Sequence, residues 1–427
     1  MSLLLSFASF ITSIGYILIA IAVLLLMVMI HELGHYTAGK ILKFKINEFS
    51  VGFGKVLFQK TNKSGEKISL RLFPLGGFCA FEGEDDEKDE KSNPQAFNNQ
   101  KPWKRLIVLF MGAFFNLLSG IIFSVIFLTC FGYADRIQVK NVTRTPSYVT
   151  TQEEWFMKGD VIYGVNGHKT NFVYDEYFKG MISKYSTDDT FDVNVIRDGK
   201  KIAIKCSLDL KDVRSRVING KTLYTFSTAQ ESKLKDKDFV YYITDNGDGS
   251  YKLLKTDDVN FVKKSNKQGV FVIGDTHLEV HAGVLQETYV GINTQFYRYG
   301  FFEALWQAIP FTFGWAWKVL VILGSLIVGK VSILGLTGPV GTISTIATVT
   351  KASAANLLLL LPMISANLAV FNLLPFPALD GARMVFVLIE WIRRKPINRK
   401  IEGYIHTGGL IFLLAFVVVV DVLHFIF

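Results

Sequence analysis

The sequence has few cysteines, few charged residues and no basic residue at its start, and each shortage excludes a class of protein. Its 427 residues include only three cysteines, Cys79, Cys130 and Cys206, which are far apart, so neither a disulfide framework nor a cysteine zinc site is predicted. Only 19% of residues are charged and 50% are hydrophobic, a bias that predicts an integral membrane protein. Residues 1–15 contain no Lys or Arg and lead to no small-residue cleavage site, so the N-terminal apolar stretch is predicted to be retained.

The formal net charge of +9 comes from Lys and Arg residues that fall largely in loops beside apolar segments. Basic residues at such positions fix the orientation of membrane helices. We therefore predict the lipid bilayer as the surroundings of the chain and no nucleic-acid partner.

Four apolar segments are each long enough to cross a hydrocarbon layer of about 30 Å. The predicted crossings are residues 7–38, 106–132, 356–391 and 408–427. Basic residues follow the first segment, precede the second and fill 393–400 between the last two. This distribution places both termini and residues 134–299 outside, and the loop between the first two crossings in the cytoplasm.

A fifth apolar stretch, residues 301–328, is harder to place. A single extra crossing would put the basic cluster 393–400 on the wrong side of the membrane, so the stretch must cross zero times or twice. Three tryptophans and Lys318 within it favour a helix lying along the outer surface.

Turn signals divide the rest of the chain. The alternating stretch 67–72 leads to Pro74-Leu75-Gly76-Gly77 and predicts a cytoplasmic β-hairpin or re-entrant loop. Asn166-Gly167 and Asp198-Gly199 predict tight hairpin turns in an external domain with a helix near 174–182, and the acidic run 84–90 predicts a solvated loop. The predicted segments are 1–133 (two membrane helices and the β-loop), 134–210 (external α+β domain), 211–299 (further β structure), 300–350 (membrane-surface helices) and 351–427 (two more membrane helices).

The pentad His31-Glu32-Leu33-Gly34-His35 lies at the end of the first apolar segment. Residues four apart share one face of a helix, so His31 and His35 can both direct a ring nitrogen at one zinc ion, with Glu32 beside them. The alternative is that these residues merely cap a membrane helix. Three ionisable side chains within a membrane segment are costly to insert, which favours the metal site.

A catalytic zinc site needs a third protein ligand, and Asp380 is the predicted one. It follows two prolines that break a membrane helix, in the segment Asn372-Leu-Leu-Pro-Phe-Pro-Ala-Leu-Asp380-Gly. His31 lies nine residues before Lys40 and Asp380 thirteen before Arg393, so both fall within about 20 Å of the cytoplasmic helix ends. The alternative role for Asp380 is to cap the helix that starts near Arg383.

In this site Glu32 is predicted to be the general base that takes the proton of the attacking water and passes it to the leaving amine, without binding the metal. Asn116, Asn372 and, more weakly, Asn367 are polar residues within apolar segments. They are candidates for hydrogen bonds to the substrate backbone or the oxyanion, or equally for bonds to carbonyls of the broken helix.

The other histidines are predicted to be structural. His277 and His281 also lie four apart with a glutamate between them, but their surroundings alternate like a strand, which would separate the rings by about 13 Å. His168, His406 and His424 are predicted to be surface or interfacial residues.

Together these motifs resemble the site-2 protease family of intramembrane zinc metalloproteases, in the bacterial branch that carries an external PDZ domain. The pentad is similar to the family's His-Glu-x-x-His motif, Gly112 to Asn116 to its Gly-x-x-x-Asn motif, and Asn372 to Gly381 to its Asn-x-x-Pro-x-Pro-x-Leu-Asp-Gly motif. Pro74 to Phe78 resembles its loop that presents substrate as an extended strand, and Gly338 to Gly341 resembles a segment before its third span.

The resemblance implies a polytopic α-helical membrane protein with four core transmembrane helices, a cytoplasmic β-hairpin or re-entrant loop and an external α+β PDZ-like domain at 134–210. It implies Zn²⁺ and a role in regulated intramembrane proteolysis in the bacterial cytoplasmic membrane. The expected substrates are single-span proteins already trimmed outside, such as anti-sigma factors or remnant signal peptides. Residues 139–156 lack the Gly-rich loop that binds free C-termini, and 211–299 is either an insertion or a diverged second PDZ copy.

Two other classes of function compete with a protease. A non-catalytic PDZ scaffold would need no combination of His31, Glu32, His35 and Asp380. A zinc transporter would need ligands spaced along a path through the membrane, whereas the predicted ligands cluster at one depth.

Overall fold

The computed structural model describes residues 2–84, 93–142, 145, 149–172, 176–178, 181, 190–207, 214–218, 221–225, 239–245, 251–256, 272–273, 292–331 and 338–426. The chain forms two compact units. The helical unit comprises Met1–Cys130 and Tyr299–Phe427, and the β unit comprises Phe131–Arg298.

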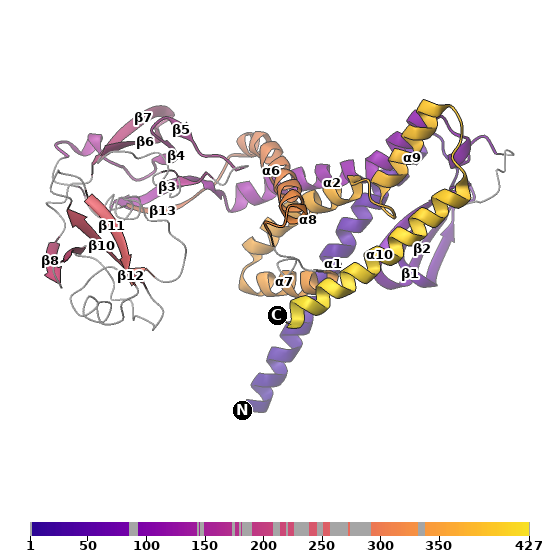
Figure 1. Cartoon of the computed structure of the whole chain (residues 1–427), viewed down its shortest axis with the longest axis horizontal. Helices are drawn as coiled ribbons and strands as arrows, with labels where there is room; N and C mark the ends of the chain where they lie inside the picture. Colours follow the sequence, from indigo (N-terminus) through magenta and orange to yellow (C-terminus); the bar gives the residue numbers. More distant parts are fainter. Residues whose placement is uncertain are drawn as a thin grey trace. The chain divides into compact units, whose positions relative to one another are not determined.

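Figure 1 labels the helices and strands of both units. The helices of the helical unit are α1 (Ser2–Ile41), α2 (Pro102–Cys130), α6 (Phe301–Ile327), α7 (Pro339–Ala352), α8 (Ala354–Leu373), α9 (Asp380–Arg393) and α10 (Arg399–Ile426). Five of the described helices, α1, α2, α6, α8 and α10, are long and apolar enough to cross a membrane. The chain is therefore a membrane protein with several apolar helices, as its composition predicts.

The predicted third crossing, 356–391, is two helices instead of one. α8 ends at Leu373 and α9 begins at Asp380. Pro375 and Pro377 lie in between and cannot donate the backbone hydrogen bonds that would continue the helix. The break matters for function because Asp380 becomes the first residue of α9.

The stretch 301–328 is helical as predicted, and its placement along the outer membrane surface stays a prediction. It forms α6, which packs against α2 and α8. The Phe311 ring stacks on that of Phe127 at 6.1 Å between centroids, and the Thr312 hydroxyl lies 2.9 Å from that of Ser124. Small residues such as Ala304 and Ala308 are fully buried, which allows this close approach between helices.

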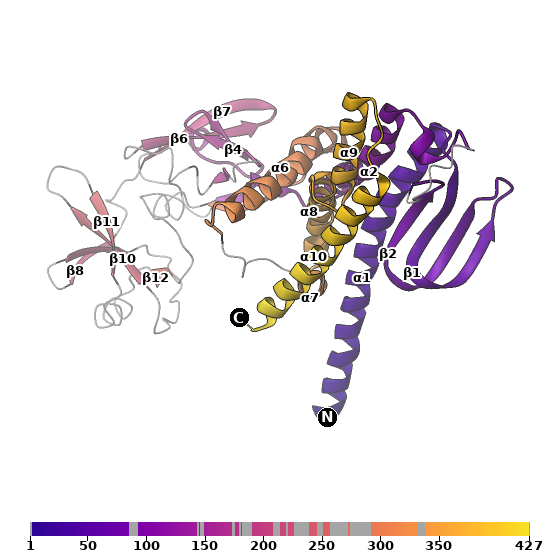
Figure 2. The ribbon, with the colours of Figure 1, turned by 45° about the vertical axis from the view of Figure 1, so that its right-hand side comes forward.

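The predicted cytoplasmic hairpin is present as β1 (Ile46–Thr61) and β2 (Lys67–Phe81), which pair antiparallel beside α1 (Figure 2). The strands curl strongly, so that Ser50 pairs with both Phe78 and Ser69. Gly52 and Gly54 adopt positive φ angles at this bend. After residues 85–92, most of the predicted acidic loop and outside the described residues, the 3-10 helix η1 (Phe97–Asn99) leads into α2.

The β unit is built around one larger antiparallel sheet. Its strands run in the order β13-β3-β4-β6-β7, with β5 beside β4. Their bounds are β3 (Tyr133–Val142), β4 (Val161–Val165), β5 (His168–Lys169), β6 (Thr190–Arg197), β7 (Lys200–Ser207) and β13 (Ile292–Tyr297), and the 3-10 helix η2 covers Gln152–Glu154. β13 belongs to this sheet, whereas the predicted segmentation placed it in 211–299. Most of the predicted helix 174–182 lies outside the described residues.

Both predicted hairpin turns are confirmed. Asn166 and Asp198 have φ angles of 48°, and Gly167 and Gly199 have φ angles of 78° and 76°. These values suit the two-residue turns that join β4 to β5 and β6 to β7. The remaining strands form two small sheets: β8 (Arg214–Ile218) with β9 (Lys221–Thr225), and β10 (Phe239–Asp245) with β11 (Tyr251–Thr256) and β12 (Val272–Ile273).

Candidate metal centre

The three predicted ligands lie together although 349 residues separate the first from the last. His31 Nε2 is 2.9 Å and His35 Nε2 is 3.2 Å from Asp380 Oδ2, and the two Nε2 atoms are 3.1 Å apart. One donor atom from each of the three side chains lies within 4.8 Å of the others. Among the described residues, this is the one group of three metal-binding side chains at such distances.

The three ligands come from two helices, α1 and α9. His31 and His35 project from one face of α1 and are 7% and 6% exposed. Asp380 begins α9 after a sharp turn, and Gly381 permits that turn because a Cβ atom there would overlap the carbonyl oxygens of Leu373 and Leu374.

Two glycines let the helices meet around the imidazole rings. A Cβ atom on Gly112 of α2 would overlap His35 Nε2 and lie 2.7 Å from His31 Cε1. A Cβ atom on Gly34 of α1 would overlap the carbonyl oxygen of Met111. The glycine of the Gly112 to Asn116 motif therefore makes space for the two ligand side chains.

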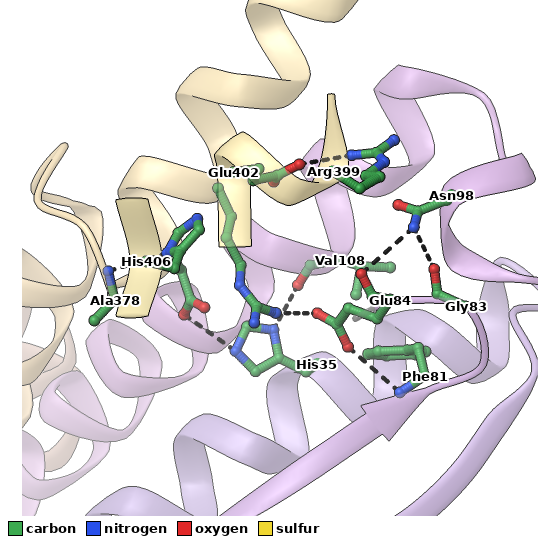
Figure 3. Close-up of polar contacts among 12 residues, drawn as sticks. His35, Phe81, Gly83, Glu84, Asn98, Val108, Ala378, Arg399, Glu402 and His406 are labelled. Carbon is green, nitrogen blue, oxygen red and sulfur yellow. Dashed lines mark hydrogen bonds and ion pairs between the residues drawn. The ribbon is translucent and has the colours of Figure 1, made fainter. Parts of the chain in front are cut away.

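The surroundings of His35 fix which nitrogen is available to a metal. Its Nδ1 lies 2.8 Å from the carbonyl oxygen of Val108 and donates a hydrogen bond to it (Figure 3). The lone pair of Nε2 then points toward His31 and Asp380. A backbone acceptor behind a histidine ring is the usual arrangement for a metal ligand.

The asparagines contact His31. Asn116 Nδ2 is 3.3 Å and Asn372 Nδ2 is 3.2 Å from His31 Nδ1. Asn116 Oδ1 is buried and has no hydrogen-bond partner among the described residues. Turning this amide brings Oδ1 to His31 Nδ1, where it can accept the proton that the ring carries when Nε2 binds a metal. The residues present thus fit a zinc ion with two imidazole ligands and one carboxylate ligand.

Glu32 lies near both the ligand side chains and strand β2. The backbone N–H of Cys79 in β2 is directed at its carboxylate, and a Cβ atom on Gly77 would lie 3.7 Å from its Cγ. Burial raises the pKa of the Cys79 thiol, which therefore stays protonated and is a poor ligand or nucleophile. The arrangement places a carboxylate between the histidines and one edge of a β-sheet.

Three predictions about polar residues have different outcomes. Asn367 is exposed on α8, five residues from Asn372 and on another face of the helix. His277 and His281 lie outside the described residues. His406, predicted to be a surface or interfacial residue, is half-buried, and its Nδ1 lies 3.1 Å from the backbone nitrogen of Ala378, two residues before Asp380. Its place within the apolar residues of α10 is the sequence signal that could have pointed to this role.

The comparisons with known proteins agree with this chemistry. The model of peptidase family M50 matches residues 19–416. The Regulator of sigma E protease of Haemophilus influenzae is 25% identical over 458 residues, which cover 96% of this chain and 98% of that protein. Protease RseP of Yersinia pestis is 25% identical over 463 residues, with 97% and 96% coverage. A proposed zinc metalloprotease of Pasteurella multocida is 26% identical over 449 residues, with 97% coverage of both chains.

Proposed function

Because this chain belongs to peptidase family M50 and is an intramembrane zinc metalloprotease, we propose that it cleaves the membrane-spanning segments of single-span proteins already trimmed outside. The observation that carries the proposal is the meeting of His31, His35 and Asp380 beside Glu32 within a helical, apolar unit. A scaffold without activity is not favoured, because it would need none of these buried polar side chains to converge.

The residues of the site have separate roles in the proposed mechanism. His31, His35 and Asp380 would hold the zinc ion, which would supply polarisation of the scissile carbonyl and a more acidic water molecule. Glu32 accepts the proton of that water and passes it to the leaving amine. Val108, Asn116 and Asn372 keep the two imidazole rings in the tautomer and orientation that ligation requires.

Strand β2 is the proposed substrate platform. A helical substrate hides its peptide bonds in its own hydrogen-bond ladder, so it must be extended before cleavage. Residues 77–81 pair with residues 46–51 on one side, and this stretch runs past Glu32. An unwound substrate that pairs with its other edge would bring its backbone to the site.

Orientation and substrate class extend the proposal. Basic residues gather at the C-terminal end of α1, the N-terminal end of α2 and between α9 and α10, which supports a cytoplasmic-side active site. The backbone N–H of Tyr299, just before α6, bonds to Leu128 O near the end of α2. The backbone N–H of Val340, at the start of α7, bonds to Asp421 near the end of α10. Because α2 and α10 would end on the same side of the membrane, these bonds support α6 and α7 both beginning on that side. The β unit, proposed to be PDZ-like, would then be external. The name of the Haemophilus influenzae relative supports an anti-sigma factor as substrate, and a remnant signal peptide is a second candidate.

The test uses the full chain reconstituted with a membrane-spanning substrate. Glu32→Gln is expected to reduce cleavage by at least about 10²-fold, the usual lower bound for loss of a general base. It should keep about one zinc per chain, since Glu32 is not a ligand. Glu153→Gln, which changes an exposed glutamate of the β unit, is the matched control and should change neither measurement. Undiminished cleavage by Glu32→Gln would contradict the mechanism.

A further inference from the structure

The loop that delivers Asp380 has an unfavourable backbone conformation. Ala378 has a φ angle of 81°, a region that residues with a Cβ atom rarely adopt. The loop also closes on itself, because Phe376 N bonds to Leu374 O at 2.7 Å and Leu379 N to Phe376 O at 3.1 Å. Such a conformation persists only where surrounding groups impose it.

One face of α10 supplies those groups. His406 Nδ1 accepts a hydrogen bond of 3.1 Å from the Ala378 N–H, as Figure 3 shows. A Cβ atom on Gly409 would overlap Pro377 Cβ, and the Phe412 ring lies 5.9 Å from that of Phe376. Residues 406, 409 and 412 are three apart and share one side of the helix. They contact three consecutive residues of the loop.

The space beside the contact between Ala378 and His406 is not filled by side chains. A cavity of about 470 Å³ is lined by both Ala378 and His406, together with residues of α2, α9 and α10 that include Arg383 and Leu410. Pro377 and Phe376 pack on α10, but Ala378 borders the cavity, where the open volume leaves its backbone room to move. The hydrogen bond to His406 is therefore a main constraint on the backbone just before Asp380.

From this geometry we infer that His406 is a positioning residue for metal binding. By accepting the Ala378 N–H it holds the left-handed turn that brings the Asp380 carboxylate to His31 and His35. The inference rests on the proposed role of Asp380 as the third ligand. It assigns to α10 a task in building the site, although the helix contributes none of the three ligands.

The first test measures zinc retention by the full chain against a competing chelator, alongside thermal unfolding. His406→Phe keeps a ring against Phe386, which His406 contacts at 5.5 Å between centroids, but removes the acceptor. We expect at least tenfold faster zinc loss with little change in unfolding temperature. His406→Asn retains an acceptor atom near the same place and should recover most of the retention.

A second substitution separates positioning from general packing. Ala378→Gly removes the steric cost of the positive φ angle, so it should restore zinc retention when combined with His406→Phe. If the double variant loses zinc as fast as His406→Phe alone, the inference is overturned, because strain at Ala378 is then not what His406 controls. Equal zinc retention by His406→Phe and the unchanged chain would also overturn it.

Two neighbouring glycines of α10 allow a matched pair of substitutions that leaves His406 unchanged. Gly409→Ala should displace Pro377 and accelerate zinc loss, whereas Gly408→Ala, whose added Cβ atom would meet nothing within 4 Å, should not. Identical behaviour of the two variants would count against α10 as the support of the loop. Asp380→Asn tests separately whether Asp380 is the third ligand. If this variant keeps zinc, the proposed ligand set fails. If Asp380→Asn loses zinc but His406→Phe does not, only the role of His406 is removed.

Discussion

Helix α2 of the helical unit and the sheet of the β unit bury different mixtures of residues. On α2, the buried side includes Arg105, Gly112, Asn116, Ser119 and Ser124, while large apolar side chains such as Ile107 and Ile122 are exposed. The β unit has the usual arrangement, with a core of Val, Ile, Phe and Trp side chains. Surrounding lipid explains the pattern on α2, because an apolar side chain gains no free energy by moving from lipid into the protein interior.

The two units consequently use buried polar groups for different purposes. In the helical unit, small and polar residues bring helices close enough for His31, His35 and Asp380 to meet. In the β unit, the buried Asp160 and the largely buried Arg197 form an ion pair that joins loop to strand. A buried polar cluster therefore indicates a reaction site only where its members offer lone pairs to a common point.

The strongest test of this contrast is Gly112→Ala in the helical unit. The added Cβ atom would overlap the His35 ring, so both imidazoles must shift and the ligand geometry is lost. We expect zinc content to fall and cleavage to decline by about 10²-fold or more, the effect of misplacing reacting groups by about 1 Å. Gly15→Ala, where an added Cβ atom would meet nothing within 4 Å, is the control. Full zinc occupancy in Gly112→Ala would mean that the helices are not closely fitted around the site.

Much of this site could be predicted from sequence, because its ligands carry local signals. The spacing of His31 and His35 fixes their common face, and Pro375 and Pro377 mark the break before Asp380. The role of Gly112 could not be derived, since only the approach of α1 and α2 shows what occupies the space beside it. The bond from Ala378 to His406 joins residues 28 apart and leaves no local pattern beyond an isolated histidine in an apolar helix.

The fold shows the same limit. Turns at Asn166-Gly167 and Asp198-Gly199 follow from local backbone preferences and were predictable. The pairing of β13 with β3 depends on contacts between residues about 150 positions apart, and no local pattern specifies it. Length and apolarity identify 301–328 as a helix, but its packing against α2 depends on partners such as Phe127 and Ser124.

A smaller effect is expected in the β unit from Asp160→Asn. Asp160 is 2% exposed and receives hydrogen bonds of 2.8 Å and 2.7 Å from Arg197. Arg197 stays charged when the carboxylate is removed, because a guanidinium does not lose its proton in proteins. Removing one partner of a fully buried pair costs about 3 to 5 kcal/mol. The cost here should be lower, because Arg197 is 13% exposed and still donates to the carbonyl oxygens of Glu153 and Trp155. The β unit of the full chain should unfold at lower denaturant concentration, as followed by the fluorescence of the buried Trp155.

This variant sharpens the comparison because its zinc content should not change. Asp198→Asn alters an exposed residue of the turn after Arg197 and should leave unfolding unaffected, since Asn is equally suited to that turn. If Asp160→Asn lowered zinc occupancy as much as Gly112→Ala, stability of the β unit and assembly of the metal site would be coupled, and the division of roles between the units would fail.

The smallest expected effect concerns how the β1–β2 hairpin is held on α1. Glu66 is 1% exposed and forms an ion pair with Lys40. Burial alone would raise the pKa of Glu66, but hydrogen bonds from Lys40 and Tyr36 outweigh it and hold the pKa below its usual value. Because the pKa of Glu66 is lower in the folded state, its stabilisation is complete above the pKa of about 4.3 that a glutamate has in the unfolded chain. The stabilisation is lost as the pH falls through the pKa of the folded state. Because Lys40 is largely solvated, Glu66→Gln should cost only about 1 kcal/mol.

Hydrogen exchange of amides 61–67 measures this contribution. After correction for intrinsic rates, protection should be the same at pH 7 and pH 5 and should decrease below about pH 4. Glu66→Gln should have, at every pH, the protection that the unchanged chain reaches only below about pH 4. Lys60→Gln, an exposed change in the same hairpin, is the control. Loss of protection between pH 7 and pH 5 would assign the docking to another titrating group. In that case the hairpin would be held on α1 by a histidine-like group, and the proposed substrate platform would respond to pH near neutrality instead of remaining fixed across it.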